Sequence, residues 1–249
     1  MIALSYGGGK QTISIVTLAL AGKLPMPDVF VMADTGREVQ TTFDYLETHV
    51  QPALAKVGRH VEIVSHNYAS VDLWRGDDLL LPAFTRQAGK LGKLPTYCSN
   101  EWKTRVIQRW LRDQGVDDVD MWIGISLDEV ERMKPSGLNW YRHVYPLIDM
   151  VHFHRSHCVN QITRFGWPVP EKSRCWMCPN QSIIEWRRLH SLRDGDFDKA
   201  VALERELHQQ DSDVYLHQFG EDLPEAVARS ERQTAMTVFD SCDSGYCMV

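Results

Sequence analysis

The stretch Ser5-Tyr6-Gly7-Gly8-Gly9-Lys10-Gln11-Thr12 follows a short apolar run at residues 2–4 and leads into an apolar run at 12–21. This order predicts a strand, a glycine turn and a buried helix. Glycine tolerates positive φ and lets an anion approach the backbone closely, so successive N–H groups can point into one concavity. The turn therefore predicts a phosphate site at the start of a helix, the alternative being a turn without a ligand.

Two familiar nucleotide loops fit this stretch poorly. A Walker loop places a serine or threonine directly after Gly-Lys, but here Gln11 stands between Lys10 and Thr12. A Rossmann fingerprint counted from Gly7 places its third glycine at position 12, which is a threonine.

The rest of the chain alternates between strand-like and helix-like patterns. Strands are expected over residues 2–4, 28–33, 60–64 and 120–126, and helices over 12–21, 41–57 and 100–114. This alternation predicts an α/β fold, a Rossmann-like parallel sheet flanked by helices, with its ligand edge at the carboxyl ends of the strands. Residues 72–96, which glycines and prolines interrupt, are expected to form a surface excursion or a mobile lid.

The C-terminal part has a different character. Helices are expected over 152–165, 183–192 and 197–209, with a cysteine-bearing loop at 166–179 and a tail over the last ten residues. We therefore predict a nucleotide-binding α/β domain at 1–150 and a helical, cysteine-bearing region at 151–249.

Composition restricts the class of protein. The 249 residues are 43% hydrophobic and contain no apolar run long enough to span a bilayer, and the N-terminus has no secretory pattern. We expect a soluble, cytoplasmic protein without a membrane partner, and a homo-oligomer. The net charge of −6 disfavours a general polyanion binder, although a local basic face could still contact nucleic acid.

Three segments resemble one known family. The opening turn is similar to the S-G-G-x-D-S signature of the PP-loop ATP pyrophosphatases, the adenine nucleotide α-hydrolase-like enzymes, except that Gly7 replaces the first serine and Gln11 the aspartate. Asp34-Thr35-Gly36, followed by Thr42, resembles the D-T-G segment of the phosphoadenylylsulfate (PAPS) reductase branch. Gly124-Ile125-Ser126-Leu127-Asp128-Glu129 with Arg132 resembles a later segment of that branch, which closes on the nucleotide.

The resemblance implies a PP-loop (HUP-type) fold and an adenine-nucleotide site. ATP or PAPS would be the substrate, with Mg²⁺ as an optional cofactor. Lys10 and Lys103 would be catalytic through their charge on the phosphate or sulfate. The residues expected to bind the nucleotide are Ser5, Gly7, Gly8, Gly9, Lys10, Gln11, Thr12, Asp34, Thr35, Gly36, Gly124, Ser126, Glu129 and Arg132.

Four cysteines form a candidate metal set. Cys175 and Cys178 make a C-x-x-C knuckle whose thiolates can reach one metal, and Cys98 opens an expected helix. Cys158 is the best fourth ligand, the alternative being a small buried apolar residue. Zinc would satisfy the same set, whereas the family resemblance favours a [4Fe-4S] cluster.

The chain ends with two further cysteines, Cys242 and Cys247. The resemblance implies a catalytic thiol on a C-terminal tail, and two tail thiols could act as nucleophile and resolving partner. The alternative is two exposed thiols without a role, or additional metal ligands.

Three functions remain open at this point. The first is a sulfonucleotide reductase that uses adenylylsulfate or PAPS together with a thioredoxin-like thiol donor. The second is an ATP-dependent enzyme that transfers sulfur from a donor protein to nucleic acid, as in tRNA thiolation or DNA phosphorothioation. The third is a nucleotide-binding module that is stabilised by a bound metal and has no catalytic activity.

Overall fold

The computed structural model describes residues 1–65, 73–87 and 89–232. The chain divides into two compact units, each built from two segments. The first unit comprises Met1–Tyr68 and Trp102–Ser173, and the second comprises Ala69–Glu101 and Arg174–Val249. This division differs from the predicted one at residue 150, because helix α6 (Arg155–Arg164) packs against α1 (Lys10–Leu20) in the first unit.

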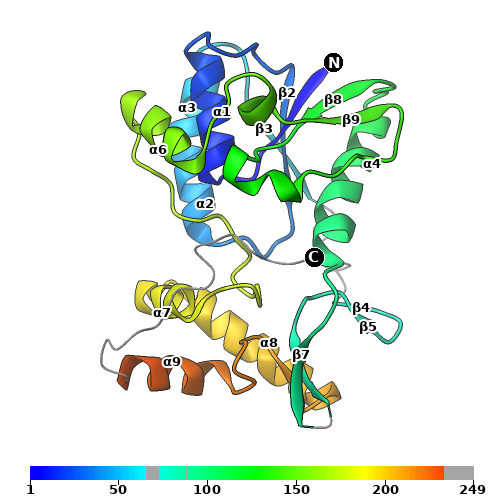
Figure 1. Cartoon of the computed structure of the whole chain (residues 1–249), viewed down its shortest axis with the longest axis vertical. Coiled ribbons are helices and arrows are strands. Elements are labelled where there is room, and N and C mark those ends of the chain that lie inside the picture. Colours follow the sequence, from blue (N-terminus) through cyan, green and yellow to red (C-terminus); the bar gives the residue numbers. More distant parts are fainter. Residues whose placement is uncertain (66–72, 88, 233–249) are drawn as a thin grey trace. The chain divides into compact units, whose positions relative to one another are not determined.

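The first unit contains the predicted parallel sheet. Its strands are β1 (Ile2–Ser5), β2 (Val29–Asp34), β3 (Val61–Ser65), β8 (Val119–Trp122) and β9 (Tyr141–Val144). They are ordered β3-β2-β1-β8-β9, and every neighbouring pair is parallel (Figure 1). The α/β fold class is therefore confirmed. Strand β9 was not predicted, because Tyr-Arg-His-Val carries two polar residues and lies at the sheet edge.

Helices cover both faces of this sheet. They are α1, α2 (Gln40–Tyr45), a π-helical turn (Leu46–Val50), α3 (Gln51–Ala55), a second π-helical turn (Asn100–Thr104), α4 (Arg105–Asp113), α5 (Pro146–Asp149) and α6. The helix predicted over 152–165 begins at Arg155, because His152 has a φ of 55° and His154 is extended.

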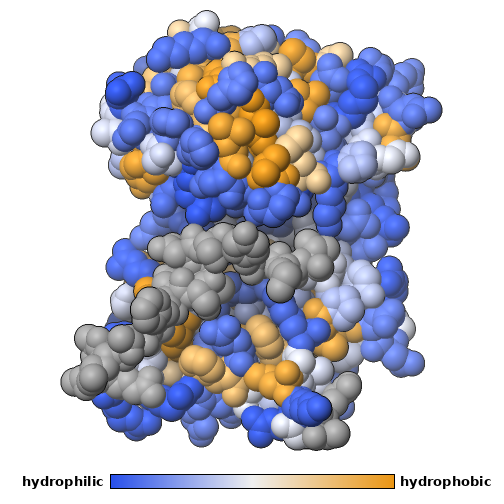
Figure 2. Space-filling view, viewed as in Figure 1, coloured by the Kyte–Doolittle hydropathy of each residue, from blue (hydrophilic) through white to orange (hydrophobic). Residues whose placement is uncertain are grey.

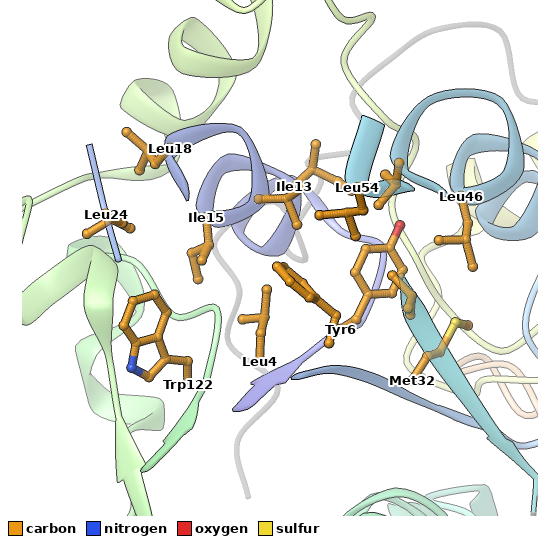
Figure 3. Close-up of a cluster of buried hydrophobic side chains, with 14 of the residues drawn as sticks. Leu4, Tyr6, Ile13, Ile15, Leu18, Leu24, Met32, Leu46, Leu54 and Trp122 are labelled. Atoms are coloured by element: carbon orange, nitrogen blue, oxygen red, sulfur yellow. The ribbon is translucent and has the colours of Figure 1, made fainter. Parts of the chain in front are cut away.

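Successive side chains along a strand point to opposite faces of the sheet, where they join two separate hydrophobic clusters. Leu4, Phe30 and Trp122 point to a cluster that includes residues of α1 and α6 (Figure 3). Their neighbours Ala3 and Met121 belong instead to a second cluster, with residues of α4. Because both faces are buried, the strands read as continuous apolar runs, which is the pattern that made them predictable.

The second unit has its own small sheet and three helices. Strands β4 (Trp74–Arg75) and β5 (Asp78–Leu79) form one hairpin, and β6 (Phe84–Gln87), β7 (Lys90–Lys93) and β10 (Val214–Tyr215) form an antiparallel sheet ordered β10-β6-β7. The helices are α7 (Ile183–Leu192), α8 (Asp196–Gln210) and α9 (Leu223–Arg232). The buried Glu204 carboxylate of α8 accepts the N–H of Leu216, directly after β10, at 2.9 Å and that of Leu223, at the start of α9, at 2.7 Å.

The described residues within 72–96, where we predicted a surface excursion or a mobile lid, form two hairpins. Gly89, with a φ of 76°, lies between β6 and β7, where a tight turn requires a residue that tolerates positive φ. Pro82 and Pro95 both lie outside the strands, so they do not interrupt the pairing.

Hydrophilic side chains cover much of the face drawn in Figure 2. Among the residues that the structure describes, no helix is both long enough and apolar enough to cross a membrane.

Candidate functional site

The order of the strands places a topological switch point between β1 and β8. From β1 the chain runs to β2 and β3 on one side, and it returns to β8 and β9 on the other. In open parallel sheets, ligands bind at the carboxyl ends of the two strands that flank such a point. Here those ends lead into the glycine turn after β1 and into Gly124, two residues after β8.

The glycine turn is anchored at its beginning. Tyr6 donates its N–H to Val31 O at 2.8 Å, and its ring is buried in the core with Leu4 and Met32 (Figure 3). Burial raises the pKa of the Tyr6 phenol, and Tyr45 adds to this, so Tyr6 is neutral at physiological pH. Tyr6 therefore acts as an anchor for the turn.

Within the turn, the three glycines have different surroundings. Gly8 is buried with a φ of 70°, and a Cβ there would lie 2.5 Å from Thr42 Cγ2. Gly9 has open space instead, since no atom lies within 4 Å of the position that its Cβ would take. Gly7 is exposed. Gly8 thus packs the turn against α2, while Gly7 and Gly9 leave the backbone accessible to a ligand.

Within the described residues, neither the N-cap nor the first turn of α1 itself supplies an acidic or capping side chain to the positive end of the helix, while Glu129 accepts from the Gln11 side chain. Gly9 is the N-cap and makes no side-chain hydrogen bond, and the first turn of the helix contains no acidic residue. Lys10, the first residue of α1, forms no salt bridge within the part of the chain that the structure describes. Free N–H groups, the helix dipole and a cation thus favour an anion at this position.

Gly124 brings the two sides of the switch point together. A Cβ at this position would lie 2.9 Å from Thr12 Oγ1, 3.1 Å from Thr12 N and 3.3 Å from Gln11 Cβ. The backbone after β8 therefore packs directly on the first turn of α1, and only a glycine permits this approach.

A charged network lies next to this contact. Gln11 Nε2 lies 2.5 Å from Glu129 Oε2, and Glu129 Oε1 lies 2.5 Å from Arg132 Nη1 and 2.9 Å from Arg155 Nη2. The Glu129 side chain is only 4% exposed. The sequence did not predict Arg155 as a site residue, because the two residues that form the Arg155–Glu129 pair lie far apart in the sequence.

Asp128 supports the same segment. Its Oδ1 accepts the N–H of Arg155 at 2.9 Å, at the start of α6. Burial raises the pKa of Asp128, but the hydrogen bond from the Arg155 N–H and the Arg155 charge are among the interactions that together lower it by more. The pKa therefore lies below the usual range, and the carboxylate is ionised at the start of α6. Ser126, a predicted nucleotide-binding residue, is fully buried.

The end of β2 forms a tight turn from the predicted adenosine-contacting residues. Asp34 Oδ1 accepts the N–H of Gly36 at 2.7 Å, and Thr35 Oγ1 accepts the N–H of Arg37 at 3.3 Å. Gly36 has a φ of 67°, a value that favours glycine. Asp34 and Thr35 thus shape the backbone beside β1, and their contact with adenosine remains a prediction.

Lys103 is paired with a buried acid that the sequence reasoning missed. Glu38 accepts from Lys103 Nζ at 3.2 Å and from Ser173 Oγ at 2.8 Å, and its side chain is 2% exposed. Ser173 Cβ lies 3.8 Å from the position of a Cβ on Gly8, so this group borders the turn. The local signal that could have identified Glu38 is its position two residues after the D-T-G segment and directly before the buried Val39.

The four predicted metal ligands are divided between the two units. Cys158 is fully buried in the core between α6 and α1, and burial raises the pKa of its thiol to about 12. Cys98, Cys175 and Cys178 belong to the second unit and are partly exposed. Across 1–65, 73–87 and 89–232, no three His, Cys, Asp or Glu side chains are grouped as a metal site. The burial of Cys158 favours its alternative role as a core residue, and the four-thiolate [4Fe-4S] or zinc set remains a prediction.

Cys158 should resist alkylation while the chain is folded. With its pKa at about 12 the thiol is almost fully protonated, and its burial excludes the reagent. We expect its modification by iodoacetamide at pH 8 to be slower by a factor on the order of a hundred than in guanidinium chloride, where the same thiol is its own control. Peptide mass spectrometry measures both rates, and equal rates would show that Cys158 is accessible.

The knuckle of the second unit is a well-supported turn. The N–H of Cys178 donates to Cys175 O at 3.0 Å, and the buried Gln181 side chain donates to carbonyls of the turn, including those of Trp176 and Cys178 at 3.1 and 3.3 Å. Arg174 donates to Gln181 Oε1 at 2.7 Å. The two thiols are thus held on a fixed backbone. Cys242 and Cys247, the predicted tail thiols, lie outside the described residues.

No protein-family model and no curated protein matches the chain. Several solved structures are similar to it, among them the following two. A phosphoadenylyl-sulfate (PAPS) reductase from Candida auris, in a phosphate complex, is 16% identical with a TM-score of 0.43, and the match covers 68% of this chain and 75% of that one. The U34-tRNA thiolase NcsA from Methanococcus maripaludis, with its [4Fe-4S] cluster, is 13% identical with a TM-score of 0.42, covering 98% and 79%.

Proposed function

We propose that the chain is an enzyme that binds an adenine nucleotide and performs sulfur chemistry with cysteine thiols. One observation supports this most strongly. The glycine turn lies at the switch point of a parallel sheet, and Gly8 and Gly124 are packed so closely that no side chain fits at either position. This is the position at which a parallel sheet binds its ligand, and the open backbone at Gly9 suits a phosphate.

The local electrostatics support an anionic ligand. The uncapped start of α1 and the ammonium of Lys10 present positive charge beside the turn. Such fixed donors cost no reorganisation when charge develops on a phosphate or on a leaving group. Adenosine would lie at the end of β2, where Asp34 and Thr35 form their turn.

The first candidate reaction uses a sulfonucleotide, adenylylsulfate or PAPS. A tail thiolate, Cys242 or Cys247, attacks the sulfur and displaces the nucleotide phosphate, which leaves a cysteine thiosulfonate. The second tail thiol then attacks the cysteine sulfur, releasing sulfite and forming a disulfide, and an external thiol donor reduces that disulfide. The resemblance to PAPS reductases and the pair of tail cysteines motivate this candidate.

The second candidate is ATP-dependent sulfur transfer to nucleic acid, and the knuckle favours it. Cys175 and Cys178 are partly exposed and held by Gln181, so they are suited to carry sulfur without the tail. In this reaction an oxygen of the acceptor attacks the α-phosphate of ATP and releases pyrophosphate. The outer sulfur of a Cys175 or Cys178 persulfide, loaded by the sulfur donor, then attacks the activated acceptor and displaces AMP, which leaves the acceptor joined to that cysteine by a disulfide. The other knuckle thiol attacks the cysteine sulfur of this bond, which releases the thiolated acceptor and forms a Cys175–Cys178 disulfide, and an external thiol donor reduces that disulfide.

Turnover by the full chain distinguishes these candidates. If the first is correct, adenylylsulfate or PAPS with dithiothreitol yields sulfite, and the double variant C242S/C247S abolishes the yield while C175S/C178S retains it. If the second is correct, ATP with RNA or DNA and a sulfur donor yields pyrophosphate, and C175S/C178S prevents sulfur incorporation. Nucleotide binding with no turnover in either assay would refute the enzyme proposal and favour a binding module.

A further inference from the structure

One side-chain hydrogen bond joins the two segments at the switch point. Gln11 lies in the first turn of α1, and Glu129 lies in the 3-10 helical segment Leu127–Arg132 that follows β8. Gln11 Nε2 donates to Glu129 Oε2 at 2.5 Å, across 118 positions of sequence. The bond therefore links the turn after β1 to the segment after β8.

The two oxygens of Glu129 have different partners. Oε2 accepts from Gln11, whereas Oε1 pairs with both Arg132 and Arg155. The carboxylate is 4% exposed, but the two arginine side chains are 54% and 33% exposed. A buried carboxylate must be fully paired to be stable, and here three donors satisfy it. Both guanidinium groups nevertheless remain accessible to a ligand.

This arrangement explains why position 11 carries glutamine. An acid at position 11 would place a second carboxylate within hydrogen-bond distance of Glu129, and two like charges repel strongly in a buried environment. The amide of Gln11 instead supplies a donor without charge. The departure of Gln11 from the aspartate of the PP-loop signature is thus matched by Glu129.

We propose that Gln11 and Glu129 are positioning residues that lock the glycine turn to Arg132 and Arg155. The lock places the N–H groups of the turn and two guanidinium groups so that they bind one extended anion together. The site would then favour a nucleotide whose polyphosphate or phosphosulfate extends beyond the α-phosphate over AMP. This inference rests on the proposed nucleotide site, because that site supplies the ligand.

A swap of the two side chains tests the lock. Gln11→Glu places two carboxylates next to each other, and Glu129→Gln removes the negative charge that pairs with Arg132 and Arg155. The double variant Q11E/E129Q restores one amide and one carboxylate with the net charge of the wild type. We expect each single variant to weaken ATP binding by about tenfold, which corresponds to about 1.4 kcal/mol, and the double variant to recover to within about threefold of the wild type.

The control is Gln114→Glu, which adds the same charge at an exposed residue that caps the end of α4, on the other face of the sheet. It should leave ATP affinity unchanged. AMP should lose less affinity than ATP in each single variant. The lock would be overturned if the loss of ATP affinity in the double variant equals the product of the losses in the two single variants. Single variants that bind ATP as tightly as the wild type would overturn it as well.

Amide hydrogen exchange of residues 7–12 without nucleotide tests the lock separately from the proposed function. Faster exchange in Q11E, restored in Q11E/E129Q, supports the lock even if the wild type binds no adenine nucleotide, a result that would refute the proposed function alone. Unchanged exchange in Q11E would overturn the lock.

Discussion

Gly8→Ala is expected to weaken adenine-nucleotide binding by about tenfold or more, since a positive φ costs a non-glycine residue about 1–2 kcal/mol and the added methyl group creates a clash. Gly8 has a φ of 70°, and its Cβ would lie 2.5 Å from Thr42 Cγ2. Relief of this contact moves the turn away from α2, and so displaces the N–H groups that we assign to the phosphates. Isothermal titration calorimetry with ATP measures the effect.

Gly22→Ala is the matched control for Gly8→Ala. Gly22 has almost the same φ, 69°, but it lies just beyond the opposite end of α1, and no atom lies within 4 Å of its added Cβ. The control should lose stability through the same backbone strain and keep its nucleotide affinity. If Gly8→Ala and Gly22→Ala bind ATP equally well, the turn does not hold the phosphates.

The second large effect is expected at Gly124. In Gly124→Ala the new Cβ would lie 2.9 and 3.1 Å from Thr12 Oγ1 and N, so the first turn of α1 must separate from β8. Overpacking of this kind typically costs about 1–3 kcal/mol. We expect a lower urea midpoint together with weaker ATP binding, because Gln11 and Thr12 move with the helix.

The control here is Gly92→Ala. Gly92 also lacks a positive φ, but its Cβ would meet no atom within 4 Å, and it lies in β7 of the second unit. Its urea midpoint and ATP affinity should match those of the wild type. A Gly124→Ala variant with the midpoint of the wild type would show that β8 and α1 are not packed as described.

The sheet of the first unit could be predicted because its signals are local. Strands β1, β2 and β8 are short apolar runs, each followed by glycine or by turn-forming residues, and strands buried on both faces require such runs. The glycine turn lies where the sequence predicted it, between β1 and α1.

The features that could not be predicted depend on long-range contacts. Strand β9 is an edge strand with a mixed pattern, and β6 finds its second partner in β10, more than a hundred residues later. Cys158 has the spacing of a ligand, but its helix packs on α1, which buries the thiol in the core. No local sequence pattern indicates that β6 pairs with β10 or that the helix of Cys158 packs on α1.

The same limit applies to the charged residues at the site. Gln11 differs from the PP-loop signature, and its reason is visible only when Glu129 is placed beside it. Glu38 is an ordinary acid in the sequence, but the fold buries it between Lys103 and Ser173. The sequence predicted the glycine turn and named Glu129 as a nucleotide-binding residue, but it did not indicate the partners of Glu129 and did not single out Glu38.

Equilibrium binding of the full wild-type chain to ATP, adenylylsulfate, PAPS and adenosine tests the central claim most directly. If the glycine turn holds the phosphates of an adenine nucleotide, at least one of the three nucleotides binds about tenfold or more tightly than adenosine, and added salt weakens the binding. No measurable binding of any nucleotide, or adenosine affinity equal to that of all three nucleotides, would contradict the account.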